Sequence, residues 1–156
     1  MKFLREFDEK GHELAELQSR LFSLSTKEKI PSYFFIKVFC YYSDVDVLDD
    51  LSFYYKNISE EDIYTRVKTK ITINHGKIYG EGEMAWIGYF YRAFSYITGM
   101  KTYVIFEKVQ PSYLRKVYYP YHTQDIVKAI KLVIKDLHIS TESDDSKIMG
   151  ILRKYA

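Results

Sequence analysis

One segment of the chain combines an arginine with large aromatic side chains, residue types that often make up a binding surface. Arg92 shares this segment with Trp86, Tyr89 and Tyr96, at spacings that bring their side chains together on a helix. A guanidinium group keeps its charge, so Arg92 must meet water, a carboxylate or an anion. Tryptophan, tyrosine and arginine dominate the energetics of protein interfaces. The segment therefore predicts either an internal ion pair or an exposed patch that binds a partner.

A second candidate lies later in the chain, around His122. Thr123 is expected to cap the next helix, with Asp125 in its first turn. His122 then either makes a structural hydrogen bond or contacts a ligand. Beside Arg92 as an anion clamp, it could also act as a general acid or base in an enzyme. The candidate residues for binding a partner or ligand are Trp86, Tyr89, Arg92, Tyr96, Tyr121, His122 and Asp125.

The common motifs of catalysis and metal binding are absent from the sequence. The four histidines stand singly and Cys40 has no cysteine partner, so we expect neither a metal nor a cofactor. There is no HExxH, GxxxxGK[ST], GxGxxG or GxSxG sequence. Cys40 lies in a strongly apolar predicted helix, where a thiol stays neutral and unreactive. A non-catalytic role is therefore the favoured prediction.

Composition indicates one globular domain inside the cell. The chain has 156 residues, a hydrophobic fraction of 47% and a formal net charge of +2, which is typical of a folded domain and excludes low-complexity disorder. No apolar run is long enough to span a bilayer. Acidic residues follow Met1–Arg5 where a secretion signal needs apolar ones. We expect a cytoplasmic protein, and the lone Cys40 fits a reducing compartment.

Hydrophobic spacing and capping residues predict a mainly α fold, a compact multi-helix single domain. Two segments stay open: 69–79 forms either a small β-hairpin or a frayed helix end, and 101–109 is either strand or helix. Residues 1–138 form the predicted helical core, and 143–155 a C-terminal amphipathic helix that packs on this core or serves as a docking arm. The remaining predicted helices cover residues 3–24, about 26–42, 44–51, 59–70, 84–97, 111–118 and 123–137.

The small net charge hides a partition along the chain. Residues 44–62 hold seven acids and one base, whereas residues 84–135 hold eight bases and two acids. Basic residues interleaved with tyrosine could meet a phosphate backbone or an acidic protein. The alternative is that these are ordinary solvated helix faces.

The same aromatic segments carry a resemblance to a known family. Met84–Arg92, followed by Tyr121–Asp125 and Ala129–Ile130, resembles small bacterial and phage proteins with a WIGYxYR…YHTxD signature, encoded near toxin–antitoxin genes. The resemblance covers roughly residues 80–134 and departs from the signature at Ala93–Phe94 and Ile126. It implies a small interaction protein whose partner is a neighbouring gene product.

Three functions follow as hypotheses. The first is a non-catalytic interaction protein, antitoxin-like or an inhibitor of a partner protein, with a homodimer through its aromatic surface as one arrangement. The second is a nucleic-acid-binding regulator. The third is a small nucleotide-binding protein or enzyme that uses Arg92 and His122, which requires both side chains to reach one pocket.

Overall fold

The computed structural model describes residues 3–140, and every regular element within that range is helical. The predicted mainly α fold in a single compact unit is therefore confirmed. No helix of the described range is both long and apolar enough to cross a membrane. The elements are α1 (Glu9–Lys27), α2 (Ser32–Tyr41), the 3-10 turn η1 (Ser43–Val45), α3 (Asp46–Asp49), the 3-10 turn η2 (Ser52–Tyr54), α4 (Glu60–Thr69), α5 (Glu81–Thr98), α6 (Thr102–Lys108), α7 (Pro111–Tyr121) and α8 (Ile126–Leu137).

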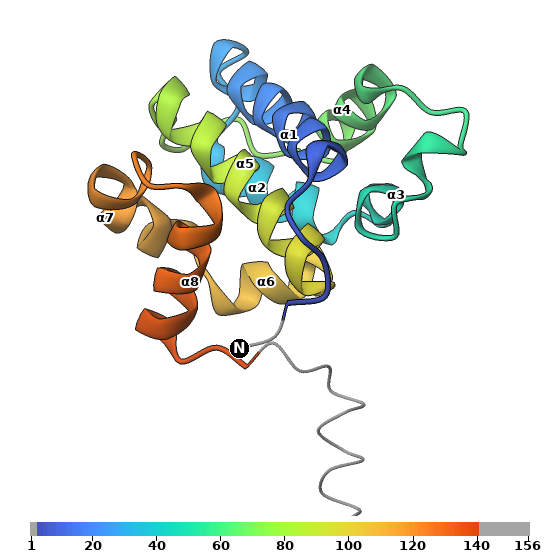
Figure 1. Ribbon diagram of the computed structural model, residues 1–156. Helices are drawn as coiled ribbons and strands as arrows, with labels where there is room; N and C mark the ends of the chain where they lie inside the picture. Colours follow the sequence, from blue (N-terminus) through green and yellow to red (C-terminus); the bar gives the residue numbers. More distant parts are fainter. Residues whose placement is uncertain (1–2, 141–156) are drawn as a thin grey trace, which may run out of the picture.

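Helices α1 and α5 form the antiparallel pair on which the rest of the fold is built. Figure 1 shows them running alongside each other, with α7 and α8 on one side of α5 and α3 and α4 on the other. A glycine makes their close approach possible, since a Cβ at Gly88 would lie 2.7 Å from Cγ of Phe22 and 2.9 Å from the backbone oxygen of Gln18. The two backbones therefore approach more closely than any larger residue at position 88 would permit.

The apolar core lies between this pair and α2. The α2 side chains Phe35, Ile36 and Phe39 are fully buried, as the apolar character of this segment predicted. Phe22 of α1 meets two of these rings edge-on, with centroids 5.3 Å from Phe35 and 5.0 Å from Phe39. Such edge-to-face contacts fix ring positions as well as burying apolar area. Part of the aromatic content of the chain therefore packs in its interior.

The first helix begins later than the apolar stripe from residue 3 predicted. Asp8 caps α1, and its side chain accepts a hydrogen bond from the backbone N–H of Gly11 at 3.0 Å. The preceding residues run outside the helix, and the N–H groups of Leu4 and Arg5 donate to the carbonyl of Ile97, at 2.7 and 3.1 Å. The Asp8 cap therefore marks the start of α1, and the residues before it bond to α5 instead.

The β-hairpin considered for residues 69–79 is wrong, because α4 ends at Thr69 and no strand follows it in the described chain. The polar groups of this segment bond to the start of α2 instead of to each other. Lys77 accepts from the N–H of Ser32 at 3.0 Å, and the N–H of Tyr79 donates to Oγ of Ser32 at 2.8 Å. Tertiary partners thus replace the ladder that a hairpin requires.

The other open segment, 101–109, is helix α6, although its β-branched and aromatic residues favour strand. A carboxylate oxygen of Asp49 accepts the first-turn N–H of Thr102 at 3.0 Å. Two predicted helix boundaries are also wrong: Asp125, not Thr123, caps α8, and α1 continues to Lys27 instead of ending at residue 24. The predicted C-terminal helix at 143–155 lies outside the described residues.

Candidate functional site

Arg92 is buried at the centre of the fold, with 1% of its surface exposed. Its guanidinium group donates to three side chains from three other helices. Nε donates to Oε1 of Gln18 at 2.8 Å, and Nη1 to Oδ1 of Asp49 at 2.6 Å. Nη2 donates to Oγ1 of Thr102 at 3.1 Å. Arg92 therefore ties α1, α3 and α6 to α5. Of the two outcomes that the sequence allowed for this arginine, the structure shows the internal ion pair.

Tyr96 and Tyr121 are also held by carboxylates. The Tyr96 hydroxyl donates to Oδ1 of Asp8 at 2.7 Å, and its side chain is nearly buried against α1. The Tyr121 hydroxyl donates to Oδ2 of Asp136 at 2.5 Å, which joins α7 to α8. Neither tyrosine lines the groove described next, so of the seven candidates only the remaining four meet at one surface site.

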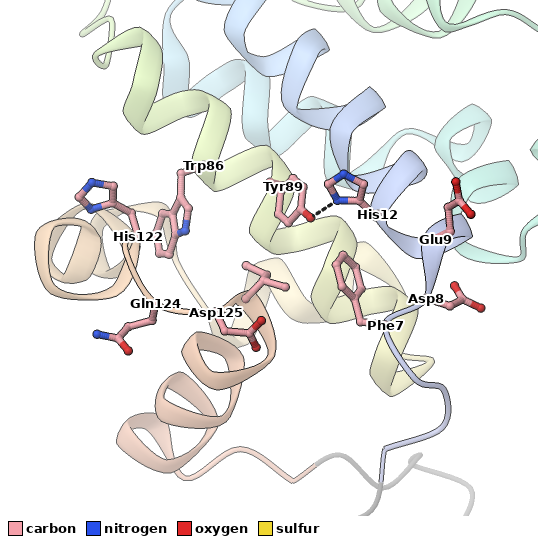
Figure 2. Close-up of a pocket in the computed structure, with 10 residues that line it drawn as sticks. Phe7, Asp8, Glu9, His12, Trp86, Tyr89, His122, Gln124 and Asp125 are labelled. Atoms are coloured by element: carbon pink, nitrogen blue, oxygen red, sulfur yellow. Dashed lines mark hydrogen bonds between the residues drawn. The ribbon is translucent and has the colours of Figure 1, made fainter.

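These four, Trp86, Tyr89, His122 and Asp125, line an open groove of about 620 Å³. It lies where the start of α1, the middle of α5 and the turn between α7 and α8 come together (Figure 2). In that view His122 and Trp86 stand at one end of the groove and Asp8 and Glu9 at the other. We call this the α1–α5–α8 groove, and its lining residues are Phe7, Asp8, Glu9, His12, Trp86, Tyr89, His122, Gln124, Asp125 and Ile126.

One wall of the groove was not predicted from the sequence. Phe7, Asp8, Glu9 and His12 come from the start of α1, which the apolar stripe assigned to the middle of a longer helix. Aspartate at the N-cap followed by an acidic residue in the first turn, here Asp8 and Glu9, is the sequence signal for a helix that begins at this point.

His12 links this wall to α5. Its Nε2 lies 3.1 Å from Oε1 of Glu16, and its Nδ1 lies 2.6 Å from the Tyr89 hydroxyl, the contact dashed in Figure 2. Because a carboxylate only accepts, the tautomer that fits both contacts carries its hydrogen on Nε2, and Nδ1 accepts a hydrogen bond from the Tyr89 hydroxyl. Burial, together with the charges of Glu16 and Asp125, raises the pKa of Tyr89 to about 12. Tyr89 is therefore a neutral donor at physiological pH and not an activated nucleophile.

His122 is fixed in place at the opposite end. Its Nδ1 donates to the carbonyl of Tyr118 at 2.6 Å, since a carbonyl oxygen can only accept. The ring also stacks on Tyr118, with centroids 4.1 Å apart. Trp86 meets the other side of this cluster, 5.7 Å from the Tyr118 centroid. The aromatic end of the groove is therefore held rigidly by α7.

The groove carries unbalanced negative charge. Its lining has the carboxylates of Asp8, Glu9 and Asp125 and contains no lysine or arginine. Hydrogen bonds from Tyr96 and from the N–H of Gly11 lower the pKa of Asp8, which keeps that carboxylate ionised. None of the three acids forms a salt bridge within residues 3–140. The site therefore combines aromatic rings with carboxylates that have no salt-bridge partner in the described residues.

Other chemistry has little support in the described part of the chain. No group of three or more histidine, cysteine or carboxylate side chains there could hold a metal ion. Burial raises the pKa of the Cys40 thiol well above its ordinary value, so this cysteine is inert. Arg92 and His122 do not share a pocket, because the groove contains His122 and Arg92 lies in the interior.

A second hollow of similar size provides a contrast to the groove. It lies between α1 and α4 and is also about 620 Å³. Two of its three acids are already paired: Glu28 with Lys68 at 3.1 Å and Glu60 with Arg20 at 3.2 Å, while Glu61 forms no salt bridge within the described residues. The fold therefore supplies lysine and arginine to this hollow and none to the groove.

Comparison with known proteins adds no relative: no family model matches the chain, and neither a curated protein nor a solved structure shows significant similarity to it.

Proposed function

We propose that the chain is a non-catalytic protein-interaction protein, antitoxin-like or an inhibitor, that binds a partner protein through the α1–α5–α8 groove. The supporting observation is that Trp86 and Tyr89 line an open groove whose rigid walls come from three separate parts of the chain. Aromatic side chains in a preformed pocket are the usual centre of a protein interface. The neutral Tyr89 and the absence of an activated nucleophile in the groove favour binding over catalysis.

The resemblance in the aromatic segments directs the search for this partner to the products of neighbouring genes in a bacterium or mobile element. We place the interaction in the cytoplasm, which the lone buried Cys40 supports.

Purified chain mixed with each neighbouring gene product tests the proposal by size-exclusion chromatography and calorimetry. Trp86→Ala should weaken the complex about thirtyfold, the loss of about 2 kcal/mol typical of an interface anchor. Tyr119→Ala is the matched control, because Tyr119 is 82% exposed on α7 and does not line the groove. Gln124→Tyr, which fills the groove without removing a core contact, should also abolish binding. Binding that survives both groove variants, or no binding to any neighbouring product, contradicts the proposal.

Nucleic acid is the second candidate because α8 exposes a row of lysines. Lys128, Lys131 and Lys135 are all exposed and form no salt bridge within the described chain. If these lysines neutralise phosphates, affinity for DNA upstream of the gene should fall steeply with salt and drop on their joint replacement by glutamine. An affinity that does not change with salt would exclude this role.

A further inference from the structure

We infer that the α1–α5–α8 groove receives the guanidinium group of an arginine on the partner protein. This inference rests on the proposed function and specifies the chemistry that the groove recognises. It follows from the charge of the groove, the nature of its rings, and the way the chain holds one of its own arginines.

Charge is the first observation. Asp8, Glu9 and Asp125 line the groove, which has no lysine or arginine among its lining residues. The Asp8 and Glu9 side chains point outward at its far end (Figure 2), whereas the Asp125 carboxylate lies close enough to Tyr89 to raise the pKa of that hydroxyl. A groove lined by one sign of charge, with aromatic walls of low dielectric, attracts the opposite sign. In the hollow between α1 and α4, by contrast, Lys68 and Arg20 each pair with one of the three glutamates, Glu28 and Glu60. The groove has no lysine or arginine of its own, so a positive group for its carboxylates must come from outside.

The rings select among cations. Trp86, Tyr89 and Phe7 lie beside the carboxylates, and tryptophan is the ring that attracts a cation most strongly. A lysine ammonium is a compact and strongly hydrated charge, whereas a guanidinium is planar. It can stack on a ring while its edge donates two parallel hydrogen bonds to a carboxylate. Aromatic rings in the same groove as a carboxylate without a salt bridge therefore fit arginine better than lysine.

The chain already holds one of its own arginines in this way. The guanidinium carbon of Arg115 lies 4.0 Å from the ring centroid of Tyr79, and its Nε donates to Oε1 of Glu83 at 3.1 Å. This ring and carboxylate, from the loop before α5 and the first turn of α5, hold an arginine from α7. The groove presents the same pair of groups, an aromatic ring and a carboxylate, without an arginine of its own.

The composition of the chain provides a direct reporter. Trp86 is the single tryptophan, so its fluorescence and its indole N–H resonance report on this groove alone. The probe is the capped tripeptide Ac-Gly-Arg-Gly-amide, compared with the same peptide carrying citrulline, which keeps the shape and loses the charge. A third peptide carries lysine.

The arginine peptide should shift the Trp86 signals saturably, and the citrulline peptide should bind at least about tenfold more weakly, a difference of about 1.4 kcal/mol. The lysine peptide should fall between them. Asp125→Asn, which keeps the helix cap, should weaken the arginine peptide, and added salt should do the same. Glu60→Gln, in the α1–α4 hollow, is the matched control and should leave binding unchanged.

No saturable shift with the arginine peptide, or equal binding of the citrulline peptide, overturns the inference. The result is separable from the test of the proposed function. A partner that binds at the groove and is not displaced by the arginine peptide leaves the proposed function standing and contradicts this inference. A peptide that binds while no neighbouring product does contradicts the proposed function and leaves the guanidinium specificity of the groove standing.

Discussion

Helix α5 carries charged and aromatic groups on two faces, which the fold treats in opposite ways. On one face Arg92 is enclosed and matched by Asp49, Gln18 and Thr102. On the other, Trp86 and Tyr89 line an open groove whose carboxylates have no cationic partner in the described structure. The difference is not one of residue type, since both faces combine polar and aromatic side chains. It lies in what the neighbouring elements supply.

The enclosed face receives its carboxylate from a short segment that is remote in sequence. Asp49 ends α3, and it also accepts the hydroxyl and the backbone N–H of Thr102. A buried charge is tolerated only when its partner and its remaining hydrogen bonds are all provided. The open face needs no such provision because water reaches it. The carboxylates of the open face can therefore remain without a cationic partner in the described structure.

The strongest way to break this contrast is to remove the enclosed cation. Arg92→Met should lower the free energy of unfolding by about 3–5 kcal/mol, because Asp49 is left buried without its partner. Urea denaturation followed by circular dichroism measures the loss. Replacing Asp49 by leucine in the same chain should recover part of it. A loss below about 1 kcal/mol would show that the ion pair is not what holds the four helices together.

The next largest effect concerns the close approach of α1 and α5. Gly88→Ala should destabilise the protein by about 1–3 kcal/mol, since the added methyl meets the Phe22 ring at 2.7 Å and the Gln18 backbone oxygen at 2.9 Å. Gly82→Ala is the control on the same helix: its Cβ meets only the Tyr118 hydroxyl, at 3.3 Å, so the gain in helix propensity of about 1 kcal/mol should dominate. Thermal unfolding of both variants checks the opposite signs.

A smaller effect separates the two roles of Asp125. Its side chain accepts from the N–H groups of Val127 and Lys128, at 3.1 and 3.3 Å, which caps α8. Asp125→Ala should cost about 1 kcal/mol of stability, whereas Asp125→Asn should cost little because asparagine caps equally well. Equal losses in the two variants, measured by chemical denaturation, would mean that the charge and not the cap stabilises this helix.

The smallest effect is visible only at alkaline pH. The folded protein raises the pKa of Tyr89 to about 12 from an ordinary value near 10, chiefly through burial. A raised pKa contributes stability that is complete below pH 10 and is lost as the pH rises through about 12. At pH 8, Tyr89→Phe should therefore lose only what the hydrogen bond to His12 contributes, and above pH 10 it should show a shallower decline of stability than the parent. Parallel declines would contradict this assignment.

The sequence predicted the helices well where a single apolar face or a glycine stop determined them. The aromatic segment that became α5 ends at Gly99, which adopts a positive φ of 77° as expected of a residue just past a helix. The secondary structure of segments 69–79 and 101–109 depends on partners distant in sequence, Ser32 for the first and Asp49 for the second. Local propensity carries no information about such partners.

The same reasoning explains which part of the site was foreseen. Trp86 and Tyr89 were identified as binding candidates from their spacing on one helix, and His122 and Asp125 from the turn before the next. Whether Arg92 faced inward depended on Asp49, whose role as its partner has no signature in the sequence. The acidic wall at Asp8 and Glu9 was not predicted, because the helix predicted over residues 3–24 included Asp8, which is the N-cap of α1.

The anchoring of α5 has a consequence for how quickly the groove can bind. Arg92 ties this helix to three others one turn away from Tyr89, so the α5 side chains of the groove stand on a helix that is anchored on its buried side. A preorganised receptor loses little conformational entropy when it captures a ligand. Association should therefore proceed in a single kinetic phase whose rate is linear in ligand concentration, with no slow rearrangement after encounter.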